Sequence, residues 1–292
     1  LADLYLQNKQ NQEAIKSYED WIRFTGEQSS DVYMRIANAY YLMDQHAQVV
    51  PAADDAIRFA AKPVEGPYQL KMAALYELRR YKDLIAHVET MVQLFPENKQ
   101  FWVYLGNFYT LTEDYSKSLS VLQMAYSQGY LEKDSDVRML AQMYANNSIP
   151  YKAAAVMEKH VKSGLIKRDK NNLTFIASNF QAAREFVKAA EYYGELAKLT
   201  NEAESYRRQG SAYLSVQRYN DAIQAFDNSL KLDSKDAGRI YMSLVEAYFY
   251  QQKYREAFAA LQNAKKDPAT SRQTRSWESY IKEKAKHKGI NL

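Results

Sequence analysis

A short pattern recurs eight times along this chain of 292 residues. In most copies a small residue follows an apolar position, and it is itself followed, three residues later, by an aromatic ring, as in the stretch WVYLGNFY. The small-residue slot holds Ala2, Ala37, Ala73, Gly106, Ala141, Ala177, Gly210 and, in the last copy, Val245. Successive copies are 35, 36, 33, 35, 36, 33 and 35 residues apart. A period of this length indicates a stack of similar units, none of which can bury its apolar face alone.

The second half of each period repeats as well. About nine residues after the ring, a small residue opens a further stretch, as at Ala14, Ser118, Ala189, Ala222 and Ala257. Proline occurs six times and glycine nine times in the whole chain, and the most frequent residues are mostly good helix formers. The sequence therefore predicts an all-α protein in which each period holds two helices joined by a turn.

The stretch from Trp102 to Tyr109 and the period of about 34 residues resemble the tetratricopeptide repeat, a helix-turn-helix unit with the pattern W-x2-L-G-x2-Y. The resemblance implies a right-handed superhelical solenoid of about eight repeats over residues 1–271, whose first repeat is incomplete at its N-terminus. Residues 272–292 are expected to form a C-terminal capping helix and tail, since Trp277, Tyr280 and Ile281 make one apolar stripe in a charged segment.

The recurring rings are expected to pack between neighbouring helix pairs. The ring slot holds Tyr5, Tyr40, Tyr76, Tyr109, Tyr144, Phe180, Tyr213 and Tyr248. Burying one ring removes ~150 Å² from water and contributes up to ~4 kcal/mol, so these rings favour stacking of the pairs. Between Phe101 and Tyr126, where seven rings occur in twenty-six positions, only Tyr104 is predicted to face outward, and Phe101 and Phe108 have no assignment.

Composition and motifs exclude several classes of function. The net charge of +4 is small for a nucleic-acid-binding surface, and no run of about eighteen apolar residues could span a membrane. The absence of cysteine excludes disulfides and thiolate chemistry. The histidines are His46, His87, His160 and His287, and none has a partner at metal-ligand spacing. With no catalytic motif present, we expect a non-catalytic protein without a cofactor or metal.

A stack of helix pairs offers a groove lined by the first helix of each pair, and residues around the small slot are expected to face it. The candidates are Arg35, Asn38, Tyr41, Lys71, Tyr104, Asn107, Arg138, Gln142, Phe175, Arg207, Arg208 and Glu246. Their rings, amides and arginines suit a protein partner presenting an extended peptide with some acidic character. The alternative is that these residues form an ordinary solvated helix face.

One known mode of peptide capture is not expected. Tetratricopeptide domains that hold chaperone tails use a clamp of Lys and Asn side chains in consecutive repeats. Here Asn38 and Asn107 lie two repeats apart, and neither has a lysine four residues before it. The sequence therefore disfavours a co-chaperone of that kind.

Four stretches resemble a narrower group, the tetratricopeptide proteins associated with TonB–ExbB–ExbD systems of marine gammaproteobacteria. They are KQFWVYLGNFYTLTEDYSKSLSVLQMAYSQGYLEK, SIPYKAAAVMEKHVKSGLIKRDKNNL, EAYFYQQKYREAF and SWESYIKEKAKHKGINL. The resemblance implies a periplasmic protein, exported by a signal peptide that is not in the printed sequence. It also implies that a TonB-system component is the partner and that the protein supports uptake of iron chelates across the outer membrane.

Two other functions remain open from the residues. The same fold could serve as an adaptor in envelope assembly, such as pilus, secretion or peptidoglycan machinery. It could also be the regulatory repeat half of an enzyme whose catalytic domain lies elsewhere.

Overall fold

The computed structural model describes residues 1–232 and 235–292. Within these ranges the chain forms seventeen α-helices and no β-strand, which confirms the all-α prediction. The first sixteen helices pair into eight helical hairpins in chain order, and a final helix follows them. The chain divides into two compact units, each described by itself below.

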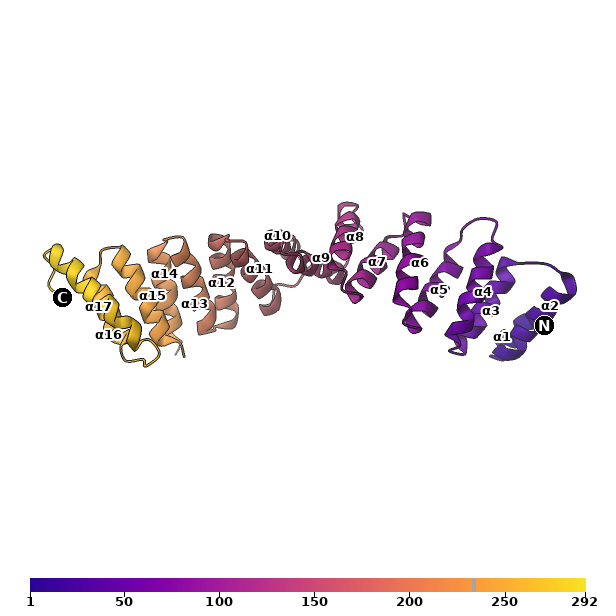
Figure 1. The fold of residues 1–292 in the computed structure, drawn as a ribbon, viewed down its shortest axis with the longest axis horizontal. Coiled ribbons are helices and arrows are strands. Elements are labelled where there is room, and N and C mark those ends of the chain that lie inside the picture. Colours follow the sequence, from indigo (N-terminus) through magenta and orange to yellow (C-terminus); the bar gives the residue numbers. More distant parts are fainter. Residues whose placement is uncertain (233–234) are drawn as a thin grey trace. The chain divides into compact units, whose positions relative to one another are not determined.

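The first unit, Leu1–Glu132, contains four hairpins (Figure 1). Its helices are α1 (Ala2–Gln7), α2 (Asn11–Thr25), α3 (Ser30–Leu42), α4 (His46–Arg58), α5 (Glu65–Glu77), α6 (Tyr81–Leu94), α7 (Lys99–Leu111) and α8 (Tyr115–Ser127). Within this unit α2, α4 and α6 each pack both against the first helix of their own hairpin and against the first helix of the next one, as α4 does between α3 and α5. The core therefore runs along the stack instead of being gathered at one centre.

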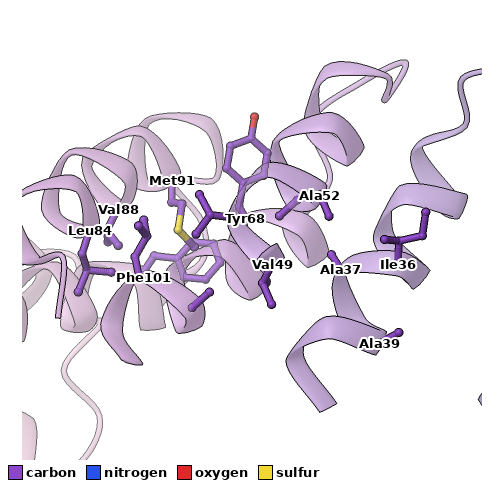
Figure 2. Close-up of a cluster of buried hydrophobic side chains, with 14 of the residues drawn as sticks. Ile36, Ala37, Ala39, Val49, Ala52, Tyr68, Leu84, Val88, Met91 and Phe101 are labelled. Carbon is purple, nitrogen blue, oxygen red and sulfur yellow. The ribbon is translucent and has the colours of Figure 1, made fainter. Parts of the chain in front are cut away.

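The core of the first unit combines small and large side chains (Figure 2). Ala37, Ala39 and Ala52 are buried in α3 and α4, where their small methyl side chains let the helices approach closely. Tyr68 and Phe101 are buried in α5 and α7, and their rings each lie about 5–6 Å from the ring of Phe95 in an edge-to-face arrangement. Small residues thus set the helix spacing and rings fill the space between hairpins.

The second unit, Lys133–Leu292, contains four hairpins and the final helix. Its helices are α9 (Asp134–Asn146), α10 (Pro150–Lys162), α11 (Lys170–Ala182), α12 (Phe186–Thr200), α13 (Ala203–Ser215), α14 (Tyr219–Lys231), α15 (Ala237–Tyr250), α16 (Tyr254–Ala264) and α17 (Ser271–His287). The closing helix α17 buries Ile281 and Ala285 against α16, and the ring of Trp277 lies 5.4 Å from that of Phe249 on α15. A helix thus packs on the last hairpin over Ser271–His287, and its charged face remains exposed.

The turn inside every hairpin has the same backbone geometry. One non-glycine residue adopts a left-handed conformation, with φ between 54° and 61°, at Lys9, Asp44, Arg79, Glu113, Ser148, Arg184, Gln217 and Gln252. The N–H of the next residue donates to the carbonyl five residues before it, at 2.8–3.0 Å in all eight hairpins. This bond closes a Schellman-type helix end and fixes the register of the first helix relative to the turn.

The turns show that the ring slot is the residue whose carbonyl accepts this bond. That residue is Tyr5, Tyr40, Tyr109, Tyr144, Phe180, Tyr213 or Tyr248 in seven hairpins, as predicted. In the third hairpin it is Leu75, not Tyr76, and Leu75 is buried while 47% of Tyr76 is exposed. A shift of one residue turns a side chain by about 100° around a helix. The packing role predicted for Tyr76 is therefore wrong.

Two glycines show why the small slot holds a residue without a side chain in their own hairpins. A Cβ atom built on Gly106 would lie 2.6 Å from Cδ2 of Leu122, and one on Gly210 would lie 2.6 Å from two ring carbons of Phe226. Leu122 and Phe226 are completely buried in the second helices of the same hairpins. The glycines thus let the two helices of a hairpin approach to the distance at which these side chains pack.

Candidate partner-binding surface

The first helices of the hairpins form one side of each unit, here called the first-helix face: α1, α3, α5 and α7 in the first unit, and α9, α11, α13 and α15 in the second. In the first unit this face carries a pocket of about 490 Å³ between α5 and α7, here called the α5–α7 pocket. It is lined by Met72, Ala73, Tyr76 and Glu77 of α5 and by Tyr104, Asn107, Phe108 and Leu111 of α7.

Helix periodicity brings these side chains to the same place. On α7, Tyr104, Asn107, Phe108 and Leu111 are three, four and seven residues apart, so they form one stripe facing α5. The ring of Phe108 lies 6.3 Å from that of Tyr104 in a stacked arrangement and 6.0 Å from that of Tyr76 across the pocket. Three rings from two successive first helices therefore share one hollow.

Two of these rings arise from local departures from the repeat. Phe108 stands five residues before its left-handed turn residue, a position held by the buried Ala39 and Ala74 in the two preceding hairpins. Its larger ring is only half-buried and extends into the pocket. Tyr76 is the exposed tyrosine next to the true ring slot. Sequence reasoning missed both contributions, and comparison of the positions relative to each turn would have found them.

The polar groups of the pocket are not satisfied by the chain itself. Among the described residues, the carboxylate of Glu77, the amide of Asn107 and the hydroxyl groups of Tyr76 and Tyr104 make no hydrogen bond or ion pair with another side chain. Glu77 is exposed, and Asn107 and Tyr104 are half-buried. An apolar floor with unused polar groups around it is the usual form of a recognition site.

Of the twelve predicted groove residues, the structure brings Tyr104 and Asn107 together in this pocket. Nearby on the first-helix face, Arg35 forms an ion pair with Asp3 of α1, Asn38 is exposed, and the ring of Tyr41 lies 5.2 Å from that of His46. Along the first unit, then, only the stretch between α5 and α7 combines several predicted and unpredicted residues in one hollow.

Lys71 lies elsewhere than predicted. Its ammonium group is 2.5 Å from a carboxylate oxygen of Asp54 on α4, and only 21% of its side chain is exposed. It stands eight residues before the turn residue, where the neighbouring hairpins carry the buried Ile36 and Leu105. The prediction placed Lys71 by the same one-residue misalignment that affected Tyr76.

Four of the six predicted residues of the second unit make ion pairs or hydrogen bonds within that unit. Arg138 contacts Asp134 at 2.8 Å, and Gln142 donates to Asn146 at 2.8 Å. Glu204 receives hydrogen bonds from Arg207 at 2.6 Å and from Arg208 at 2.8 Å, and Arg207 lies 4.0 Å from Asp236. The last two predicted residues, Phe175 and Glu246, are half-buried.

These contacts have an electrostatic consequence. The hydrogen bonds from Arg207, and then those from Arg208, hold the pKa of Glu204 below its ordinary value despite partial burial. The carboxylate therefore stays ionised and neutralises part of the arginine charge. On the first-helix face of the second unit the predicted arginines are thus paired with carboxylates of the same unit, whereas Glu246 makes no ion pair among the described residues.

Other kinds of site are not evident in the described part of the chain. Across residues 1–232 and 235–292, no group of three or more histidine or acidic side chains is placed to hold a metal ion. None of the helices in those ranges combines the length and the apolar character needed to cross a membrane.

The closing hairpins carry the family match. Residues 207–271, which cover most of α13 and all of α14, α15 and α16, match the family model described as tetratricopeptide repeat. The chain contains tetratricopeptide repeats. Among curated proteins there is no match to the sequence.

Solved structures align with this chain at low sequence identity. A structure of Naa15/Naa10 bound to HypK-THB aligns with a TM-score of 0.58 and 14% identity, over 90% of this chain and 43% of that one. The TPR2AB-domain:pHSP90 complex of yeast Sti1 aligns with a TM-score of 0.45 and 15% identity, over 87% of this chain and 96% of that one. YrrB, described as a TPR protein with an unusual peptide-binding site, aligns with a TM-score of 0.47 and 16% identity, over 67% of this chain and 97% of that one.

Proposed function

We propose that this protein is a non-catalytic scaffold that binds an extended segment of a partner protein on its first-helix face, with the α5–α7 pocket as the main anchor point. The observation that carries the proposal is the pocket itself. Three rings and unused amide, hydroxyl and carboxylate groups converge there. Tetratricopeptide repeats serve as protein-binding modules, and a side chain entering an apolar pocket is a common source of binding energy.

Aromatic anchors support this proposal energetically. The rings of Tyr76, Tyr104 and Phe108 are already held by packing on helices. Binding a partner would therefore cost little side-chain entropy of these rings. An extended segment lying across successive first helices would place one side chain in the pocket and its backbone near Asn107. Residues on either side, such as Asn38, would then contribute smaller contacts.

A peptide selection tests the proposal. The purified chain would be screened against a display library of random twelve-residue peptides, and the affinities of selected peptides would be measured by fluorescence anisotropy. We expect the affinities to fall at least tenfold in the double variant Tyr104→Ala, Phe108→Ala. Tyr151→Ala is a matched control, because Tyr151 is also an exposed tyrosine but lies on α10 of the second unit. Selected peptides that bind the double variant as well as the original chain would contradict the proposal.

For the cellular role, we propose that the partner is a component of a TonB system and that the protein acts in the periplasm. The support is the resemblance of four long stretches of the chain to tetratricopeptide proteins associated with such systems. The alternative is an adaptor in envelope assembly, which would use the same surface. Deletion of the gene separates the two: impaired growth on iron chelates is expected for the first, whereas normal growth with a pilus or cell-wall defect would support the second.

A further inference from the structure

The α5–α7 pocket has an electrostatic character opposite to the one expected from the sequence. Its one charged residue is Glu77, which is exposed and has no ion pair among the described residues. The cations next to it in the sequence are Arg79 and Arg80, which do not line the pocket, and Arg80 is bound to Asp83 at 2.7 Å. A partner group entering here therefore meets an uncompensated negative charge.

The helix ends add to this negative character. The pocket lies at the last two turns of both α5, which ends at Glu77, and α7, which ends at Leu111. Helix C-termini carry partial negative charge, and basic side chains often neutralise it. Neither α5 nor α7 has a basic residue in its last turn. Both helix dipoles therefore favour a cation at this position.

The rings of the pocket also lack a cation that comparable rings in this chain possess. Lys117 lies 5.3 Å from the ring centre of Tyr109, Lys188 lies 4.9 Å from that of Phe180, and Arg218 lies 4.8 Å from that of Tyr213. Within the described ranges, Tyr76, Tyr104 and Phe108 have no such neighbour. Their ring faces can attract a positively charged group, most strongly where part of its water shell is removed.

From these three features we infer that the α5–α7 pocket accepts a basic side chain, a lysine or arginine, of the partner segment. This rests on the proposed function, which requires only that a segment bind there. The alkyl part of the side chain lies against Met72 and Leu111, the cation faces the rings, and the charge is matched by Glu77. An acidic side chain at the same place would be repelled by Glu77 and by both helix ends.

Small probes test the inference without any partner. The full chain would be labelled with 4-fluorophenylalanine, and the ¹⁹F signal of Phe108 would be assigned from its loss in Phe108→Leu. The probes are the N-acetyl methylamides of arginine, lysine, leucine and glutamate. We expect the arginine and lysine probes to shift the Phe108 signal at concentrations about fivefold lower than leucine does, and glutamate to cause no shift.

Glu77→Gln supplies the decisive variant, because Glu77 is exposed and its replacement leaves the packing intact. We expect it to weaken binding of the arginine probe about fivefold and to leave the leucine probe unchanged. Glu113→Gln is the matched control, since Glu113 is an exposed carboxylate just beyond α7 that does not line the pocket. An equal affinity for leucine and arginine, an unchanged affinity in Glu77→Gln, or no shift with any probe would overturn the inference.

The selected peptides separate this inference from the proposed function. Peptides that need Tyr104 and Phe108 but carry no lysine or arginine would overturn the preference for a basic side chain and leave the scaffold function standing. A chain that selects no peptide and still binds the arginine probe at Phe108 would support the basic pocket and contradict segment binding.

Discussion

The two units carry the same hairpin architecture but treat their first-helix faces differently. In the first unit the α5–α7 pocket exposes three rings and an unpaired carboxylate, Glu77. In the second unit Arg138 is paired with Asp134, and Glu204 bridges Arg207 and Arg208. Exposed pairs of this kind contribute little stability, but they reduce the charge available to a partner. On a shared scaffold, the rings and carboxylate of the α5–α7 pocket therefore remain available to a partner, whereas the predicted arginines of the second unit are already paired.

The difference depends on a few positions counted from the turn. The residue five positions before the left-handed turn residue is the buried Ala39, Ala74, Ala212 or Ala247 in four hairpins. In the hairpin of α7 and α8 the same position holds Phe108, whose ring forms a wall of the pocket. The ring of Phe108 at this position thus contributes a wall of the pocket, whereas Met143 at the same position of the next hairpin is buried.

The largest expected effect separates two tyrosines that occupy neighbouring positions of their hairpins. Tyr109 is 5% exposed, and its hydroxyl donates to Glu89, whereas 47% of Tyr76 is exposed in the pocket. We expect Tyr109→Ala to lower the free energy of unfolding by ~3–5 kcal/mol, as a core truncation does. Tyr76→Ala should cost about 1 kcal/mol or less, since only part of its ring is packed. Urea unfolding followed by circular dichroism measures both changes. Equal losses of unfolding free energy would contradict the assignment of Tyr109 to the core and of Tyr76 to the surface.

A smaller effect compares the close helix contacts of the two units. Gly210→Ala would force a Cβ atom to 2.6 Å from the buried ring of Phe226, whereas Gly106→Ala would meet the branched end of Leu122. Overpacking costs ~1–3 kcal/mol, and the better helix propensity of alanine returns about 1 kcal/mol. We expect a net loss for Gly210→Ala and a smaller one for Gly106→Ala, because Leu122 can change rotamer more easily than a ring can move. Thermal unfolding of the two variants measures which substitution costs more stability. A larger loss for Gly106→Ala would show that the packing around Phe226 in the second unit adjusts more easily than the packing around Leu122.

A third change tests whether the ion pairs of Glu204 with Arg207 and Arg208 keep the second unit from binding an acidic peptide. Glu204→Gln removes the carboxylate shared by Arg207 and Arg208. We expect a loss of stability below about 1 kcal/mol. The affinity for a glutamate-rich peptide at low salt should increase a few-fold, because two guanidinium groups become available. Glu185→Gln is the control, since it removes one negative charge from the same unit at an exposed residue without a side-chain helix-cap bond. An equal increase in affinity in both variants would indicate that the change in net charge, and not the release of Arg207 and Arg208, causes it.

The smallest expected effect concerns the closing helix. Hydrogen bonds from Lys265 and then Lys282 lower the pKa of Glu278 on α17 to about 2, from an ordinary value of 4.5. Because the folded value is the lower one, the ion pairs stabilise the second unit above pH 4.5, and this contribution is lost as the pH falls toward 2. Glu278→Gln should therefore cost less than about 1 kcal/mol at neutral pH and nothing near pH 2.

Glu283→Gln is the matched control for that titration. Glu283 lies on the same helix, its side chain is 63% exposed, and one of its carboxylate oxygens lies 3.7 Å from Nε2 of His287. Chemical unfolding of both variants between pH 7 and pH 2 gives the comparison. A cost of Glu278→Gln that does not change with pH would show that these ion pairs are not its source.

The fold was predictable because its cause is steric and recurs. A small residue must stand where Gly106 meets Leu122, and a ring must fill the next space, so the spacing of both is visible in the sequence. The site was predictable only in part. Tyr104 and Asn107 were found by their position, but Tyr76 and Lys71 were misplaced, because an alignment on residue type cannot see a shift of one residue.

The ion pairs of the second unit follow from the spacing of charged residues in the sequence. Arg138 follows Asp134 by four residues, and Arg208 follows Glu204 by four, which is the spacing of neighbouring side chains on a helix. These arginines therefore offer little free positive charge to an acidic partner. The unpaired state of Glu77 depends on which side chains lie across from it, and a single sequence does not give that arrangement.

The eight left-handed turn residues have a practical consequence for the stability of the chain. Each is a residue with a Cβ atom in a conformation that costs roughly 1–2 kcal/mol and that glycine adopts freely. Replacing the residue with glycine would relieve this cost. The greater entropy of glycine in the unfolded chain opposes the gain by about 0.4–1 kcal/mol, so each replacement should leave a modest net increase in the free energy of unfolding. Because the turns lie in separate hairpins, these gains should add. The turns are therefore the positions at which a more heat-resistant version of this protein could be engineered without altering the residues that line its pocket.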